Sequence, residues 1–63
     1  MKKYKEAVEH FKSSVTMLES VTDKKTRSDE KADLFYMIGM CYEKLNEAKL
    51  SFKNYQSALK YRS

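Results

Sequence analysis

This 63-residue chain contains no proline and only one glycine, so helices can form along most of it. The glycine, Gly39, lies inside the apolar run from Phe35 to Tyr42, with helix-forming residues on both sides. A glycine inside a helix costs about 1 kcal/mol relative to alanine. We therefore expect a second helix to pass so close to Gly39 that a Cβ atom would not fit, in an all-α chain organised around this run.

The apolar periodicity divides the chain into three helices. Apolar residues at steps of three and four from Tyr4 to Val21 predict a first helix over about residues 3–22. Residues 22–28 lack this rhythm and are expected to form a loop, with Ser28 as the N-cap of a second helix over about 29–45. Asn46 is expected to end that helix, since asparagine tolerates the left-handed conformation.

A third helix is predicted over about residues 47–62, and the short connection makes it an antiparallel neighbour of the second helix. Its apolar and small positions are expected to be buried, namely Ala48, Ser51, Phe52, Tyr55, Ala58 and Leu59. Four of them repeat a pattern of the first helix 44 residues earlier, where the chain has Ala7, Phe11, Ser14 and Val15. Such self-similarity is typical of a helical solenoid.

The second and third helices resemble a tetratricopeptide repeat. The motif of that family is Trp-x₂-Leu-Gly-x₂-Tyr, then Ala-x₃-Phe, then Pro. This chain has Phe35-x₂-Ile38-Gly39-x₂-Tyr42, then Ser51-x₃-Tyr55, with Ala58 at the later small position. The residue types keep the size class of the motif except at the terminal proline, for which the chain has Ser63. The resemblance implies three antiparallel helices forming about one and a half repeats, as a single domain over 1–63 or as a fragment of a longer solenoid. The 44-residue spacing is also similar to that of bacterial Rap-type regulators, which sense peptides.

The resemblance implies a binding site as well. In this family the first helix of each repeat lines a groove that holds a peptide, and the matching positions here share one face of the second helix. They are Asp33, Tyr36, Met37, Met40, Glu43 and Lys44. The alternative is that Tyr36, Met37 and Met40 are core residues covered by the first helix. The family's carboxylate clamp is not expected, because these three side chains occupy the places of its polar residues.

No pattern in the sequence indicates catalysis, a cofactor or a metal. Cys41 is the only cysteine and His10 the only histidine, so further metal ligands are missing. The chain has no glycine-rich phosphate loop and no set of nucleophile, base and orienting group. A lone cysteine fits a structural role in a reducing compartment, and a cytoplasmic location is expected. No segment approaches the ~20 apolar residues of a membrane helix, so no membrane partner is expected.

Three kinds of partner stay open. The preferred one is a protein or peptide held in the groove, as in a bacterial peptide-responsive regulator. The alternative is a homodimer that joins open apolar faces on the first and third helices, or exchanges a helix. The third is a nucleic acid, because the segment from Ala48 onward is basic and Tyr61 is free to stack. We interpret those cations instead as a solvated face that favours the helix dipole.

Overall fold

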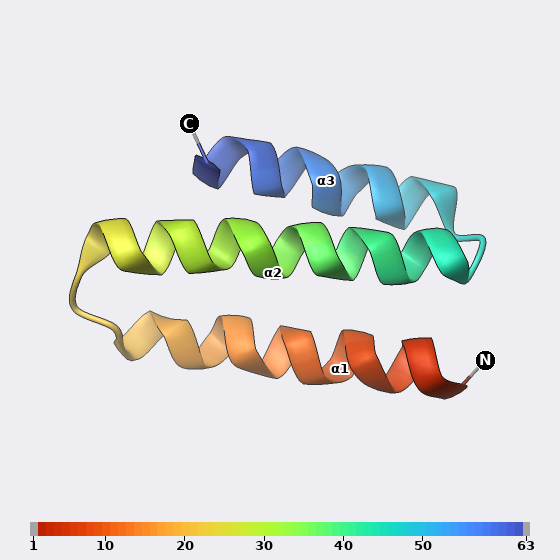
Figure 1. Cartoon of the computed structure of the whole chain (residues 1–63), viewed down its shortest axis with the longest axis horizontal. Helices are drawn as coiled ribbons and strands as arrows, with labels where there is room; N and C mark the ends of the chain where they lie inside the picture. Colours follow the sequence, from red (N-terminus) through yellow and green to blue (C-terminus); the bar gives the residue numbers. More distant parts are fainter. Residues whose placement is uncertain (1, 63) are drawn as a thin grey trace.

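The computed structural model describes residues 2–62. These residues form three α-helices, α1 (Lys2–Met17), α2 (Lys24–Lys44) and α3 (Ala48–Arg62), and a 3₁₀ turn, η1 (Leu18–Ser20), follows α1. The described part of the chain has no strand, so the predicted all-α class with three helices is confirmed. Consecutive helices run antiparallel, and α2 lies between α1 and α3 (Figure 1).

The three helices form a single layer. The molecule measures 35 × 21 × 11 Å, and its thinnest dimension is about the diameter of one helix with its side chains. α1 and α3 both pack on α2, but their backbones do not approach each other. α2 is therefore the central helix, as its apolar run predicts. Ile38, on one side of α2, is only 1% exposed, whereas the opposite side of the helix carries exposed residues.

The start of α2 differs from the sequence-based expectation. The helix begins at Lys24, not at residue 29, and Asp23 is its N-cap. The Asp23 carboxylate accepts hydrogen bonds from the Lys25 backbone N–H (3.2 Å) and the Thr26 hydroxyl (2.7 Å). The first bond satisfies a free backbone donor of the first turn and the second holds the Asp23 carboxylate in place, so the helix begins here without apolar periodicity. Ser28, the expected N-cap, lies inside the helix, and the loop shrinks to residues 21–23.

The end of α2 agrees with the prediction. Asn46 is the one described non-glycine residue with a positive φ, 62°, and the helix ends two residues before it. The Glu47 backbone N–H then donates to the Tyr42 carbonyl (2.9 Å), which satisfies one of the last carbonyls of the helix. This short turn makes α3 the antiparallel neighbour of α2, as expected from the length of the connection.

Only part of the stripe expected to be buried on α3 is buried. Ser51 and Ala58 face α2 at 5% and 7% exposure, and Tyr55 is half-buried. The remaining three side chains were predicted to be buried but are exposed, namely Ala48, Phe52 and Leu59. The physical reason is that α3 has a single neighbour, α2, which covers only one narrow side of the helix.

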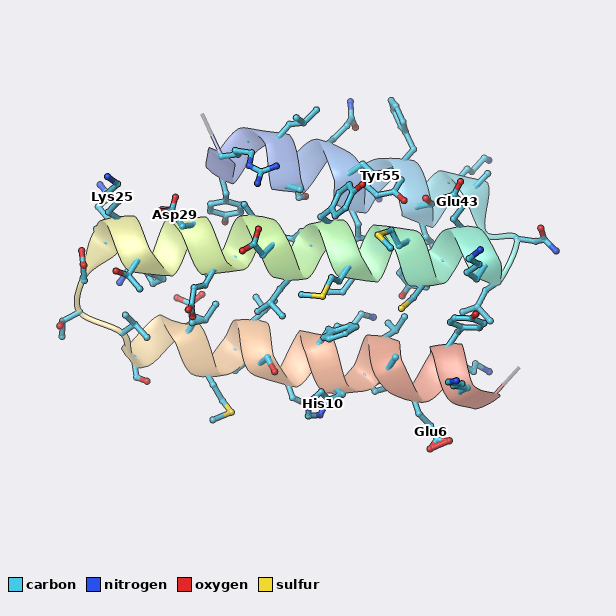
Figure 2. The ribbon with its side chains drawn as sticks, in the orientation of Figure 1. Glu6, His10, Lys25, Asp29, Glu43 and Tyr55 are labelled. Carbon is cyan, nitrogen blue, oxygen red and sulfur yellow. The ribbon has the colours of Figure 1, made fainter. Side chains whose placement is uncertain are left out.

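The apolar stripe of α1 packs against α2, and the outer edge of the helix is polar. Val8 is buried, and Tyr4, Phe11 and Val15 are half-buried. Glu6 and His10 point away from α2, at the outer edge of α1 (Figure 2). Met17 is the single large exposed apolar side chain among the described residues of this helix.

Candidate binding surface

α2 and α3 are in very close contact at Gly39. A Cβ added to Gly39 would lie 2.8 Å from Cδ1 and Cε1 of Tyr55 and 3.2 Å from the Ser51 carbonyl oxygen. Distances below 3.0 Å are inside van der Waals contact, so the ring occupies the space that any other residue would need. The close approach expected from the sequence is thus present, and it involves both backbone and side chain of α3.

The six residues expected to line a groove all lie on the side of α2 that its neighbours leave uncovered. Tyr36, Met37 and Met40 are 53%, 38% and 43% exposed. The charged residues at the two ends of the set are exposed too. We call the six residues together the open face of α2: Asp33, Tyr36, Met37, Met40, Glu43 and Lys44. Each of the three apolar members keeps more than a third of its surface exposed, so none of them is a fully buried core residue, as the alternative interpretation expected.

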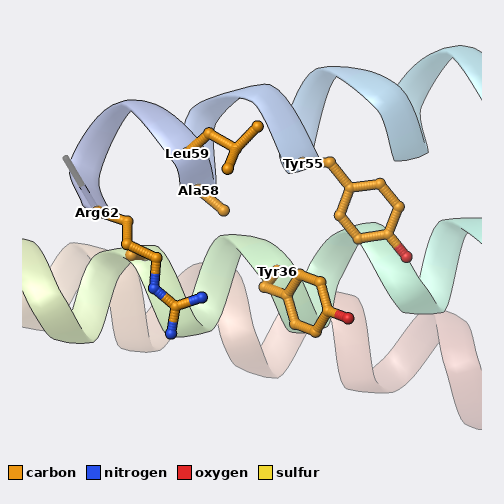
Figure 3. Close-up of a pocket in the computed structure, with 6 residues that line it drawn as sticks. Tyr36, Tyr55, Ala58, Leu59 and Arg62 are labelled. Atoms are coloured by element: carbon orange, nitrogen blue, oxygen red, sulfur yellow. The ribbon is translucent and has the colours of Figure 1, made fainter.

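A cleft runs along each side of the open face. The α2–α3 cleft has a volume of about 390 Å³, and its walls come from Ala32, Tyr36, Tyr55, Ala58, Leu59 and Arg62. The rings of Tyr36 and Tyr55 lie 5.3 Å apart at 44°, and Arg62 stands at the other end of the cleft (Figure 3). Sequence analysis missed Arg62 and Leu59 because their contribution depends on how far α3 extends along α2.

The α1–α2 cleft is smaller, about 300 Å³, and is apolar apart from two lysines at its rim. It is lined by Lys3, Tyr4, Ala7, Phe11, Met37, Met40, Cys41 and Lys44. Four of the six predicted residues line these two clefts: Tyr36 belongs to the α2–α3 cleft, and Met37, Met40 and Lys44 belong to the α1–α2 cleft. Asp33 and Glu43 border further hollows at the two ends of the face.

Both carboxylates of the open face have partners on α3. Asp33 lies 3.9 Å from the Arg62 guanidinium, and both side chains are well exposed, so this pair contributes little to stability. The Tyr55 hydroxyl donates a hydrogen bond of 2.9 Å to Glu43, and the two residues lie side by side in Figure 2. Partial burial and this bond to a carboxylate raise the pKa of Tyr55, so the hydroxyl keeps its proton and remains a donor.

Tyr61 is not free to stack on a base. Its ring is parallel to that of Phe35, with centroids 5.7 Å apart and an interplanar angle of 12°. The Lys31 ammonium lies 5.4 Å from the same ring and forms an ion pair with Glu19. Tyr61, the aromatic side chain on which the nucleic-acid interpretation depended, therefore already has two partners within the chain.

Cys41 is half-buried in the wall of the α1–α2 cleft. Across residues 2–62 no group of three or more His, Cys, Asp or Glu side chains is placed to hold a metal ion. None of the described helices is long and apolar enough to cross a membrane.

Comparison with known proteins gives no relative from which a role could be transferred. No family model matches the chain, and neither the curated proteins nor the solved structures contain a match. The function must therefore be argued from the surface itself.

Proposed function

We propose that this chain is a non-catalytic, tetratricopeptide-like module that binds a protein or peptide on the open face of α2. The observation that carries the proposal is the exposure of Tyr36, Met37 and Met40 at the centre of that face. Exposed aromatic and methionine side chains between charged ends are typical of surfaces that bind peptides, because they combine apolar contact area with adaptable shape. A solvated helix face does not need them.

The arrangement of the motif residues supports the tetratricopeptide-like part of the proposal. Gly39, Ser51 and Ala58 are the small residues of the motif, and all three are buried. Tyr55, at the aromatic position, fills the space beside Gly39. The motif requires these residue types for the same reasons: small residues allow two helices to pack closely, and an aromatic ring fills the space between them.

The narrower expectation is that the module belongs to a bacterial, cytoplasmic, peptide-responsive regulator. It is supported by the 44-residue spacing of the repeated pattern and by the single cysteine. Within this proposal the clefts beside the open face would receive side chains of the bound peptide, and Asp33, Glu43 and Lys44 would fix its direction through charge.

A library of displayed random peptides, selected on the immobilised chain, tests the proposal because it assumes nothing about the sequence of the partner. Enriched peptides are synthesised, and their affinity is measured by calorimetry for the wild type and for the double variant Tyr36→Ala/Met40→Ala. We expect at least about a tenfold loss of affinity, since buried aromatic anchors are commonly worth more than 1 kcal/mol each. Helicity should be retained, because both side chains are about half exposed in the free protein.

Met17→Ala is the matched control, because Met17 is 73% exposed but lies on α1, away from the open face. This variant should bind the selected peptides as the wild type does. Equal affinity of the double variant and the wild type would show that the open face is not the binding site. A loss of helicity in the double variant would show that Tyr36 and Met40 maintain the fold.

A further inference from the structure

The α1–α2 cleft has apolar walls along its whole length. Its volume of about 300 Å³ is at the lower end of the range for small-molecule sites, about 300–1,000 Å³. No polar atom of the residues that line it is exposed inside it. Beyond two lysines, its walls come from Tyr4, Ala7 and Phe11 of α1 and from Met37, Met40 and Cys41 of α2. Such walls favour an apolar group over any group with hydrogen bonds to satisfy.

Two lysines lie at one end of this cleft. Lys3 is in the first turn of α1 and Lys44 is the last residue of α2, and antiparallel packing brings these two helix ends together (Figure 1). Because no polar atom is exposed inside the cleft, both lysines line it through their methylene stems, and their ammonium groups lie at its rim. The cleft therefore has a charged end and an apolar length.

The two ammonium groups at the rim have no counter-charge within the described part of the chain. The side chains of Lys3 and Lys44 form no ion pair or hydrogen bond with residues 2–62. No aspartate or glutamate is among the residues that line the cleft. Two like charges that share one rim repel each other, and an anion placed between them removes that repulsion.

The α2–α3 cleft differs from this one in both respects. Polar atoms are exposed inside it, and its cation, Arg62, already lies 3.9 Å from the Asp33 carboxylate. The α1–α2 cleft is therefore the one in which an apolar lining coincides with unpaired positive charge.

The length of the cleft limits the apolar part of a ligand. Lys3 and Phe11 are eight residues apart on α1, and Met37 and Lys44 are seven residues apart on α2. At a rise of about 1.5 Å per residue, these spans correspond to roughly 10–12 Å. A groove of this length and volume has room for one unbranched alkyl tail of medium length, but not for the two tails of a phospholipid.

We propose that the α1–α2 cleft binds a free fatty acid of medium chain length. The tail lies between α1 and α2, along Ala7 and Met40, and the carboxylate lies between the ammonium groups of Lys3 and Lys44. Removal of the tail and the cleft walls from water supplies the affinity. The charge-assisted contacts at the rim fix the direction of the ligand.

A peptide backbone is a poorer occupant of this cleft than an alkyl tail. Each residue of a backbone brings an N–H and a C=O group that need partners, and the walls expose none. A fatty acid carries its polar atoms at one end, where the lysines are. The fatty-acid site goes beyond the proposed peptide function, but Met37, Met40 and Lys44 belong to both surfaces. A bound fatty acid would therefore compete with a peptide on the open face.

Calorimetry with decanoate below its micellar concentration tests the site on the purified chain. We expect saturable binding of one decanoate per chain. Decyltrimethylammonium has the same tail with a cationic head and should bind at least about tenfold more weakly, because the rim is positive. Acetate, which has the head without the tail, should show no binding at the same concentrations.

Two pairs of lysines separate the site from the general positive charge of the chain. Lys3→Gln/Lys44→Gln should weaken decanoate binding at least about fivefold, since it removes both charges at the rim. Lys49→Gln/Lys53→Gln is the matched control, because it lowers the net charge equally but changes exposed residues of α3. This control should bind decanoate as the wild type does, and circular dichroism checks that both variants keep their helices.

Cys41 supplies a direct readout of occupancy. It is the only cysteine of the chain and lies half-buried in the wall of the cleft. A bound tail covers this wall, so alkylation of Cys41 by iodoacetamide should slow severalfold in saturating decanoate and stay unchanged in acetate. The readout is independent of the heat of binding and reports on this cleft alone.

The proposal is overturned if decanoate does not bind, or if the folded Lys3→Gln/Lys44→Gln variant binds it as tightly as the wild type. An unchanged rate of Cys41 alkylation in saturating decanoate would also refute it. Binding to vesicles of anionic phospholipid without binding of decanoate would assign the surface to a membrane instead. Tyr36 lines the other cleft, so Tyr36→Ala should leave decanoate affinity unchanged. Failure of the peptide selection alone therefore leaves the fatty-acid site standing.

Discussion

Replacing Gly39 with alanine sets two opposing effects against each other at the α2–α3 contact. Alanine favours the helix by about 1 kcal/mol over glycine. The new Cβ, however, would lie 2.8 Å from two ring carbons of Tyr55 and 3.2 Å from the Ser51 carbonyl oxygen. Rotating the Tyr55 ring away from the new Cβ costs free energy, because the ring contacts Tyr36 and its hydroxyl donates a hydrogen bond to Glu43. The Ser51 oxygen belongs to the backbone of α3, so the whole helix must move to give way.

Overpacking of this kind typically costs about 1–3 kcal/mol. After the gain in helix propensity, we expect Gly39→Ala to lower the free energy of unfolding by about 1 kcal/mol. Urea unfolding followed by circular dichroism measures it, and the denaturation slope should stay unchanged if both states keep their surface areas. Gly39→Leu should abolish the fold, since the larger side chain separates α2 from α3. A Gly39→Ala variant more stable than the wild type would refute the close-contact argument.

A second background isolates the ring as the cause. In a Tyr55→Ala protein the two ring atoms nearest to the new Cβ are gone, and the Ser51 oxygen at 3.2 Å is the one remaining tight neighbour. Gly39→Ala should then be markedly less destabilising than in the wild type, or stabilising through helix propensity. An equal loss in both backgrounds would place the strain on the α3 backbone alone.

The remaining predictions concern the two turns and one ion pair. Asp23→Ala should lower the melting temperature and helicity because it removes the N-cap of α2, whereas Ser28→Ala, inside the helix, should change the melting temperature little. Asn46→Ala should lower the free energy of unfolding by about 1 kcal/mol and Asn46→Gly should not, because φ is 62° there. The hydrogen bond and charge of Lys31 lower the pKa of Glu19, so this carboxylate stabilises the fold above its ordinary pKa and loses that contribution as the pH falls through the lowered value. The melting temperature of Glu19→Gln should therefore lie below that of the wild type at neutral pH and converge with it in acid.

The sequence was sufficient to predict a structural feature where a residue type has a single physical reason to be present. Gly39 predicted a close neighbour because nothing else justifies a glycine inside an apolar helix, and Tyr55 and Ser51 are that neighbour. Asn46 predicted the end of α2 because few other residues tolerate a positive φ. The all-α class followed from the absence of proline and the scarcity of glycine. In each case the properties of a single residue type were enough to make the prediction.

The start of α2 was predicted wrongly because the loss of apolar periodicity after Val21 was interpreted as a loop that extends to Ser28. Asp23 and Ser28 both have side chains that accept hydrogen bonds from a first turn. The turn that Asp23 caps is polar and exposed, so it leaves no apolar signal in the sequence. Arg27 adds a further bond, from its guanidinium to the Val21 carbonyl (2.8 Å), that no local pattern indicates.

The candidate surface shows a different limit. The six residues of the open face could be placed on one side of a helix from their spacing, but not assigned to groove or core, since that depends on where α1 lies. The division of the face between two clefts depends on tertiary packing in the same way. Arg62 lies near Asp33, which precedes it by 29 residues, only because α3 folds back along α2.

The wrong prediction for Phe52 and Leu59 is itself informative about function. Helical periodicity shows that a face is made to contact another surface, but not whether that surface belongs to the same chain. The apolar side of α3 runs from Ser51 and Ala58 across Tyr55 to Phe52 and Leu59, which is wider than one neighbouring helix covers. α2 accounts for the first part of that width. The exposed remainder lies beside Lys49 and Lys53, so this part of the apolar side is left for a surface outside the three helices.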